Sequence, residues 1–191
     1  MENRIIELAI NGHILSKDVK ENNIPTIYLS RLEKKGKIKK VSRGIYVLND
    51  YIEDYFYIYA SQYSKLVYTN LTALYLNNLT NRQFTGYEAI FPYGTNTKDI
   101  PIKGYVTRNK DMYELGIDYI LTPYGNKVKC HDRERCICNV FLFNLVDEEE
   151  KAYIIKEYIQ NYLNIEKLYS YAKKLGCYER IKDIFEIVLW D

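Results

Sequence analysis

The sequence lacks the features that would direct it to a membrane or out of the cell. No apolar run approaches the roughly 20 residues that a membrane-spanning helix needs. The N-terminal residues 1–4 lead directly into an amphipathic pattern, without the apolar segment of a signal peptide. We therefore expect a cytoplasmic protein with no membrane partner, whose four cysteines are reduced thiols.

Complete motifs for metals and phosphates are also missing. Cys130, His131, Cys136 and Cys138 lie close together, but no second Cys-x-x-Cys or His pair completes a zinc site. The chain has no glycine-rich loop of the Walker type. We therefore assign no catalytic residue, metal ligand or cofactor. A metal-dependent nuclease that uses residues 132–134 is a weaker alternative, because adjacent side chains in an extended segment point apart.

Internal repeats, low-complexity tracts and flexible linkers are absent from the 191 residues. Hydrophobic residues make up 47% and charged residues 27%, which is typical of a folded protein. The net charge of +2 is unevenly distributed: residues 1–50 hold ten Lys/Arg and six Asp/Glu, while the remainder holds seventeen and nineteen. A basic first quarter on a slightly acidic remainder favours a nucleic-acid-binding module joined to a different domain.

The first fifty residues show three helical patterns followed by an alternating one. Ser16 is a suitable N-cap for the second helix, and Gly36 suits the left-handed residue after the third. The expected elements are helices over residues 2–11, 16–20 and 24–35, then a hairpin that turns at 42–44. This order predicts a winged helix-turn-helix, a motif that places its second helix in the DNA major groove.

The third of these helices has the polarity that DNA reading requires. Leu29 and Leu32 lie three residues apart and should face the core, which leaves a polar, cationic face outside. Arg can read guanine in bidentate fashion, Ser and Thr can reach bases or phosphates, and Lys neutralises phosphates. With the hairpin cations included, the predicted DNA-binding residues are Thr26, Ile27, Ser30, Arg31, Lys34, Lys39, Lys40 and Arg43.

The remaining residues alternate between strand and helix patterns and then become helical. Helices are expected at 51–62 and from Thr69 or Asn70 to 76, and strands at 66–68, 87–91, 104–107 and 117–122. From residue 135 onward we expect helices, one beginning at 148, one ending at 173–176 and the last at 178–190. The predicted class is α+β: a winged helix-turn-helix domain over 1–50, then a larger mixed α/β domain over 51–191 with a small sheet and C-terminal helices.

Several segments, in order along the chain, resemble AbiEi-type antitoxins of type IV toxin–antitoxin systems, which act in abortive infection, a form of phage defence. In the first fifty residues these segments are Ile14-Leu15-Ser16-Lys17-Asp18, Tyr28-Leu29-Ser30-Arg31-Leu32, Lys35-Gly36-Lys37-Ile38 and Val41-Ser42-Arg43-Gly44-Ile45-Tyr46. The later ones are Thr72-Ala73-Leu74-Tyr75-Leu76, Leu79-Thr80-Asn81-Arg82, Thr122-Pro123-Tyr124-Gly125, Asp132-Arg133-Glu134-Arg135-Cys136-Ile137-Cys138, Asn164-Ile165-Glu166-Lys167-Leu168 and Tyr171-Ala172-Lys173-Lys174-Leu175.

The resemblance implies an antitoxin that opposes a nucleotidyltransferase-like toxin and represses its own operon. The chain lacks the Gly-Ser and Asp-x-Asp pattern of such toxins, so the toxin chemistry is expected in another protein. Operator DNA with inverted repeats is the expected partner, bound by two copies as a dimer or as cooperating monomers. We assign Arg133, Glu134 and Arg135 to contact with the toxin. An antitoxin that acts only through protein contact, without binding DNA, is the main alternative.

Overall fold

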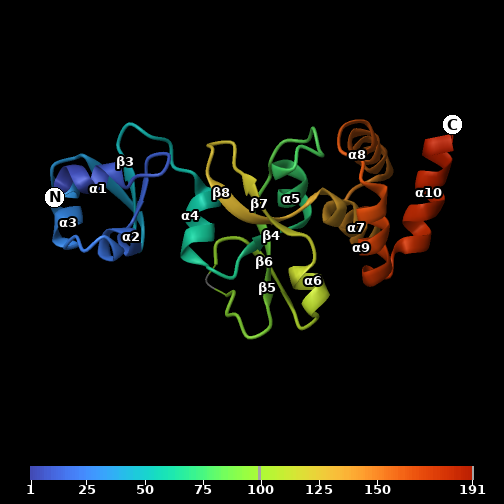
Figure 1. The fold of residues 1–191 in the computed structure, drawn as a ribbon, viewed down its shortest axis with the longest axis horizontal. Helices are drawn as coiled ribbons and strands as arrows, with labels where there is room; N and C mark the ends of the chain where they lie inside the picture. The colour runs from blue at the N-terminus through green and yellow to red at the C-terminus, as the bar shows by residue number, and fades with distance from the viewer. Residues whose placement is uncertain (99, 191) are drawn as a thin grey trace. The chain divides into compact units, whose positions relative to one another are not determined.

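The chain folds into two units, and the structure, a computed structural model, describes residues 1–98 and 100–190 (Figure 1). Unit 1 comprises Met1–Ser64 and Leu121–Val128, and unit 2 comprises Lys65–Ile120 and Lys129–Asp191. The fold is α+β, as the sequence predicted. This division describes packing, and the functional boundary at residue 50 stays a prediction. None of the described helices is both long enough and apolar enough to cross a bilayer.

Unit 1 contains the helix-turn-helix and the hairpin that the alternating pattern indicated. Its elements are α1 (Glu2–Glu7), β1 (His13–Leu15), α2 (Ser16–Glu21), α3 (Ile27–Lys34), β2 (Ile38–Ser42), β3 (Ile45–Leu48) and α4 (Tyr55–Gln62). The strands form an antiparallel sheet in the order β1-β3-β2. The hairpin β2–β3 therefore stands at the position of a wing directly after α3.

The sheet of unit 1 separates two apolar clusters. On one face, Ile14, Ile38 and Tyr46 pack with Leu29 and Leu32 of α3, the two residues predicted to face the core. On the other face, a smaller cluster joins the sheet to α4 and consists of Leu15, Ile45 and Ile58. Since the buried side of α3 is fixed by this packing, its opposite side is presented outward.

Four expectations for unit 1 are corrected. The third helix begins at Ile27 rather than at residue 24, because the backbone bonds before it, from Tyr28 N to Pro25 O and from Leu29 N to Thr26 O, span only three residues. The first helix ends at Glu7 rather than at residue 11, because Ile10 pairs with His13 and the chain turns through Asn11 and Gly12 at positive φ. Ser16 is the first helical residue and makes no capping bond. The helix expected at 51–62 begins only at Tyr55, because the side chain of Asp54 caps it by accepting from Tyr57 N. Strand β1 was not predicted.

Unit 2 consists of a mixed sheet followed by a group of helices. Its elements are β4 (Val67–Tyr68), α5 (Asn70–Leu76), β5 (Glu88–Pro92), β6 (Lys103–Thr107), α6 (Lys110–Glu114), β7 (Ile117–Leu121), β8 (Lys127–His131), α7 (Arg133–Phe143), α8 (Glu148–Asn161), α9 (Ile165–Leu175) and α10 (Tyr178–Trp190). The strand order is β6-β5-β4-β8-β7. Helix α7 packs against α5, α8 and α9, and α10 against α9. Helices α7, α8, α9 and α10 lie together at the C-terminal end of the ribbon, which is coloured from gold to red (Figure 1).

Most predicted elements of unit 2 are present, with ends shifted by a residue or two. Helix α8 begins at Glu148 as predicted, and α9 ends before Gly176, which has the expected left-handed conformation. Strand β8 and the short helix α6 were not predicted. Helix α7 begins two residues earlier than expected, because Asp132 caps it by accepting from Arg135 N.

Candidate nucleic-acid interface

The position of α3 is set by the turns at its two ends. The turn from α2 passes through Asn23 at φ 55°, and Ile24 N donates to Val19 O at 3.0 Å. At the C-terminal end, Gly36 N donates to Glu33 O, and Lys37 N donates to Leu32 O at 2.9 Å. This pair of bonds is a Schellman motif, which requires the left-handed residue that Gly36 supplies. Helix α3 is therefore fixed in length and direction.

The outward face of α3 carries the side chains predicted to read DNA. Ser30, Arg31 and Lys34 are exposed, and Thr26 is half-buried. Ile27 is 55% exposed although it is apolar. An exposed isoleucine on an otherwise polar face is suited to an apolar contact such as a thymine methyl group.

Arg31 is held in place by its neighbour on the same helix. Its guanidinium carbon lies 5.0 Å from the centre of the Tyr28 ring. Tyr28 is partly buried and packs on the core of unit 1, so the ring is a fixed platform. A guanidinium held over an aromatic ring loses less conformational freedom when it binds a base edge than a free side chain does.

The two lysines of the wing point in opposite directions. Lys39 pairs in register with Val47 and Lys40 with Tyr46, and neighbouring side chains of a strand alternate between faces. Lys40 therefore shares the face of Ile38, toward the cluster that contains α3. Lys39 lies on the α4 face. Val41, next along the strand, lies on the same face as Lys39 and packs against the α4-side cluster.

Lys39 is already engaged with an acid inside unit 1. Its Nζ lies 2.5 Å from Glu53 Oε1, and the hydrogen bond from Lys39 lowers the pKa of Glu53. By contrast, Arg31, Lys34, Lys40 and Arg43 have no ion pair among the residues that the structure describes. The charges of Arg31, Lys34, Lys40 and Arg43 are therefore available to phosphate groups of DNA. We call these four residues the free cations.

A buried polar cluster that the sequence did not indicate supports unit 1. The carboxylate of Asp54 is fully buried and accepts from Thr122 Oγ1 at 2.6 Å and from Asn126 Nδ2 at 2.8 Å. Asp54 N donates to His13 Nε2. The cluster joins α4 to residues 121–128, which complete unit 1 from a distant part of the sequence. A Thr-Pro-Tyr-Gly turn and a single Asp carry no signal for this pairing.

The three residues assigned to toxin contact lie at the start of α7. Arg133 is half-buried, and its guanidinium carbon lies 3.9 Å from the centre of the Tyr162 ring. Glu134 and Arg135 are buried, so a partner could reach them only if surrounding side chains moved. The assignment of these three residues stays a prediction.

The carboxylates of the alternative nuclease site are paired with a lysine. Lys167 Nζ lies 2.8 Å from Glu134 Oε2 and 3.0 Å from Asp132 Oδ2, and Tyr158 donates to Glu134. These contacts join α9 and α8 to α7. No group of three or more His, Cys, Asp or Glu side chains within 1–98 and 100–190 is arranged to hold a metal ion. The four cysteines are all buried and free.

Comparisons with known proteins give a match for the N-terminal part of the chain. No curated protein matches the sequence. The sequence model of a family described as "Transcriptional regulator, AbiEi antitoxin" matches residues 3–49. The match covers α1 to β3, including the helix-turn-helix and the wing, and it agrees with the resemblance seen in the sequence. Residues 3–49 are thus similar to the AbiEi antitoxin family of transcriptional regulators.

Proposed function

We propose that this protein is a DNA-binding autorepressor and antitoxin of an abortive-infection system. The observation that carries the proposal is the pairing of an outward α3 face with the cations of the wing in a domain that is similar to a family of regulators. Ile27, Ser30 and Arg31 enter the major groove, with Thr26 and Lys34 at its edges. Lys40 and Arg43, and more weakly Lys39, contact phosphates from the hairpin.

The DNA-binding part is tested on the DNA immediately upstream of the protein's own gene. Fluorescence anisotropy compares this DNA with a scrambled sequence at two salt concentrations. The variant Arg31→Ala/Arg43→Ala is measured beside Lys110→Ala/Lys182→Ala, which removes the same charge from unit 2. We expect the first variant to lose roughly ten- to hundredfold in affinity, because it loses a base contact and a phosphate contact. The control variant retains binding.

Equal affinity for upstream and scrambled DNA would contradict autorepression. Full binding by Arg31→Ala/Arg43→Ala would remove α3 and the wing from the interface. The first result would favour the alternative in which the antitoxin acts only through protein contact, whereas the second would assign DNA binding to another surface of the protein. Binding that depends on phosphates also weakens steeply with salt, which protein contact alone does not require.

The antitoxin part of the proposal states that the protein opposes a nucleotidyltransferase-like toxin. It rests on the similarity of residues 3–49 to the antitoxin family and on the resemblance of later segments. Co-expression with the adjacent toxin gene, read out as growth, tests it. If neutralisation belongs to unit 2, Arg31→Ala/Arg43→Ala will lose repression and still restore growth. Loss of both activities would assign neutralisation to the DNA-binding surface.

A further inference from the structure

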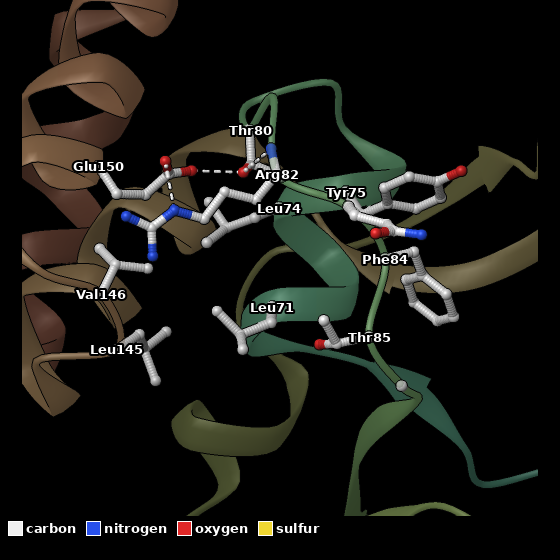
Figure 2. A pocket seen from close by; sticks show the side chains of 12 residues that line it. Leu71, Leu74, Tyr75, Thr80, Arg82, Phe84, Thr85, Leu145, Val146 and Glu150 are labelled. Carbon is white, nitrogen blue, oxygen red and sulfur yellow. Dashed lines mark hydrogen bonds and ion pairs between the residues drawn. The ribbon is translucent and has the colours of Figure 1, made fainter.

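A hollow of about 180 Å³ lies between α5 and the start of α8 and has charged side chains in its wall (Figure 2). Its cation, Arg82, donates to Asp147 Oδ2 at 2.6 Å and lies 2.9 Å from Glu150 Oε2. Thr80 also donates to Glu150. The dashed lines of Figure 2 show the contacts with Glu150. Because these charges are paired within the protein, they are not available to a ligand.

Unpaired polar groups of unit 2 lie instead on strand β6, at one edge of the five-stranded sheet. The strand order is β6-β5-β4-β8-β7, and β6 pairs in parallel with β5 without a shift of register. No further strand pairs with β6 among residues 1–98 and 100–190. The residues of β6 are exposed or half-buried, whereas those of β5 are mostly buried. An edge of this kind presents backbone groups that can pair with a strand of another chain.

The hydrogen bonds between β5 and β6 show which backbone groups of β6 face outward. Lys103 N donates to the carbonyl oxygen just before β5 at 2.9 Å, and Thr107 O accepts from the N–H just after β5 at 2.8 Å. The first and last residues of β6 thus direct their backbone groups toward β5. Since alternate residues of a strand direct these groups to opposite sides, the N–H and C=O groups of Gly104 and Val106 point away from the sheet.

The strand at the opposite edge, β7, is protected from such pairing. Asp118 is exposed, and its Oδ1 accepts from Tyr119 N at 2.7 Å. A carboxylate at an edge occupies a backbone donor and discourages the approach of another strand. Strand β6 has no proline and no bulge, and its one charged side chain, Lys103, is paired with Glu88 at 3.1 Å. Of the two edges, β6 is therefore the one that is open to a further strand.

The backbone of β6 fits a second copy of β6 in the antiparallel direction. Tyr105 is the central residue, so pairing about Tyr105 uses the whole strand and sets Gly104 opposite Val106 of the second copy. Both of these residues direct their backbone groups outward, so each such pair exchanges both of its N–H···O bonds. The two Tyr105 residues then form the closely spaced pair without hydrogen bonds. A two-fold axis at Tyr105 thus satisfies every outward backbone group of the strand.

Side chains across this axis are complementary in size and charge. Val106 is 44% exposed and meets Gly104 of the second copy, which has no side chain to oppose it. Lys103 meets Thr107 of the second copy, so like charges do not face each other. Phe143 of α7 lines the same hollow as Val106 and is 47% exposed, which adds apolar surface beside the edge. This match of side chains favours a second copy over a strand of unrelated sequence.

We propose that β6 is a homodimer interface, in which the β6 strands of two copies pair antiparallel about a two-fold axis at Tyr105. The pairing joins two five-stranded sheets into one continuous sheet. A strand pair of this length buries less than a standard interface, so we expect a weak dimer with a dissociation constant of about 10–50 µM. The dimer links two copies of the DNA-binding unit. Its interface belongs to unit 2 and does not depend on the proposed operator binding.

Sedimentation velocity of the full chain, without DNA, tests the association. We expect monomer at about 1 µM and mostly dimer at about 300 µM, several times above the expected dissociation constant. Val106→Pro removes an outward N–H, and its ring lies where the second strand would pair, while the bonds to β5 stay intact. This variant should weaken association at least roughly tenfold. Val106→Ala keeps the N–H and should weaken association by clearly less.

Disulfide crosslinking tests the register. Two cysteines at the axis would have Cα atoms about 4.5 Å apart, within reach of a disulfide. Tyr105→Cys should therefore form a covalent dimer on oxidation with diamide, seen on a gel without reductant. Thr107→Cys places the two thiols on opposite sides of the axis, about 13 Å apart along the strands, and should form none. The unmodified chain, whose four cysteines are all buried, gives the background.

A chain that stays monomeric at about 300 µM would overturn the proposal and leave the β6 edge to a strand of another protein. A dimer that Val106→Pro does not weaken would also overturn it, because the interface would then lie elsewhere. If Val106→Pro does not fold, crosslinking decides: no covalent dimer from Tyr105→Cys, or an equal yield from Thr107→Cys, would reject the two-fold pairing. Operator binding is tested separately by Arg31→Ala/Arg43→Ala, so the two proposals can fail independently.

Discussion

Lys39 and Lys40 are adjacent in β2, yet their side chains meet different surroundings. Lys39 is bonded to Glu53 on the α4 face, while Lys40 has no ion pair among the described residues. A lysine that must break an internal ion pair before it binds phosphate contributes less binding free energy than a lysine without such a pair. We therefore expect Lys40→Ala to reduce the salt dependence of operator binding by about one phosphate contact. Lys39→Ala should reduce it by clearly less.

The ion pair itself provides the control for this comparison. Glu53→Gln removes the carboxylate charge and releases Lys39, so this variant should bind operator DNA at least as tightly as the unmodified protein. Anisotropy over a salt series measures all three variants. A greater loss for Lys39→Ala than for Lys40→Ala would mean that Lys39 leaves Glu53 and contacts DNA.

His131 makes unit 2 sensitive to mild acid. It is buried between Thr69 and Tyr113, and burial, with Arg135 nearby, lowers its pKa to about 3. In the unfolded chain this histidine is protonated as pH falls through about 6.5, whereas in the folded chain it stays neutral until pH nears 3. The stability that follows from this difference is therefore complete above pH 6.5 and declines as pH falls toward 3. We expect a loss of about 2 kcal/mol between pH 7.5 and pH 5.

Urea unfolding at the two pH values measures this loss. His131→Gln retains a side chain that can donate and accept hydrogen bonds but does not titrate, so its stability should change less over the same range. His13, in unit 1, supplies the comparison variant His13→Gln. If His131→Gln and the unmodified chain lose the same stability, the pH dependence arises from other groups.

At the scale of elements, the turn into β7 depends on a single glycine. Gly116 has φ +80°, and a Cβ placed there would lie 2.7 Å from Arg135 Cβ and 2.9 Å from Asp132 Oδ1. Gly116→Ala therefore combines left-handed strain with a clash against the first turn of α7. We expect a loss of about 2–5 kcal/mol in the free energy of unfolding.

Gly94 separates the two contributions in this prediction. It has φ +86°, and a Cβ there would meet nothing within 4 Å, so Gly94→Ala carries the strain alone. Its expected cost is about 1–2 kcal/mol. Denaturant unfolding of both variants gives the difference. Equal losses would show that the contact with α7 relaxes freely.

Elements whose signals are local were predictable from the sequence. Leu29 and Leu32 define the buried side of α3, and Gly36 its end, because helical period and left-handed preference act within a few residues. The short strand β1 was missed, since its three buried residues form a strand only by pairing with β3. Strand β8 was missed for the same reason, because it pairs in parallel with the distant β4.

The candidate sites divide in the same way. The outward α3 residues follow from helical period, but the pairing of Lys39 with Glu53 depends on how the chain returns after β3. Arg135 was assigned to toxin contact, which requires an accessible side chain, but it is buried. Its burial follows from the packing of α7 against α5 and α9, which no local pattern describes.

At the scale of the whole molecule, unit 1 is discontinuous in sequence. Residues 121–128 belong to it and supply two of the hydrogen bonds that the buried carboxylate of Asp54 accepts. Asp54 also caps α4. Helix α4 in turn packs on the wing's sheet through the smaller cluster of Leu15, Ile45 and Ile58. Changes near residue 125 should therefore weaken the DNA-binding unit, although no DNA contact is assigned there.

The variant Thr122→Val/Asn126→Ala tests this dependence in the full chain. Removing both donors leaves a buried carboxylate short of partners, which costs roughly 2–5 kcal/mol of local stability. Hydrogen exchange should then be faster at the backbone amides of α4, and affinity for operator DNA should fall without a change in its salt dependence. Tyr124→Ala alters an exposed residue of the same loop and should change neither measurement. Unchanged exchange in α4 would show that residues 1–64 hold their structure without the loop. A reduced salt dependence would instead mean that the loop itself contributes a phosphate contact.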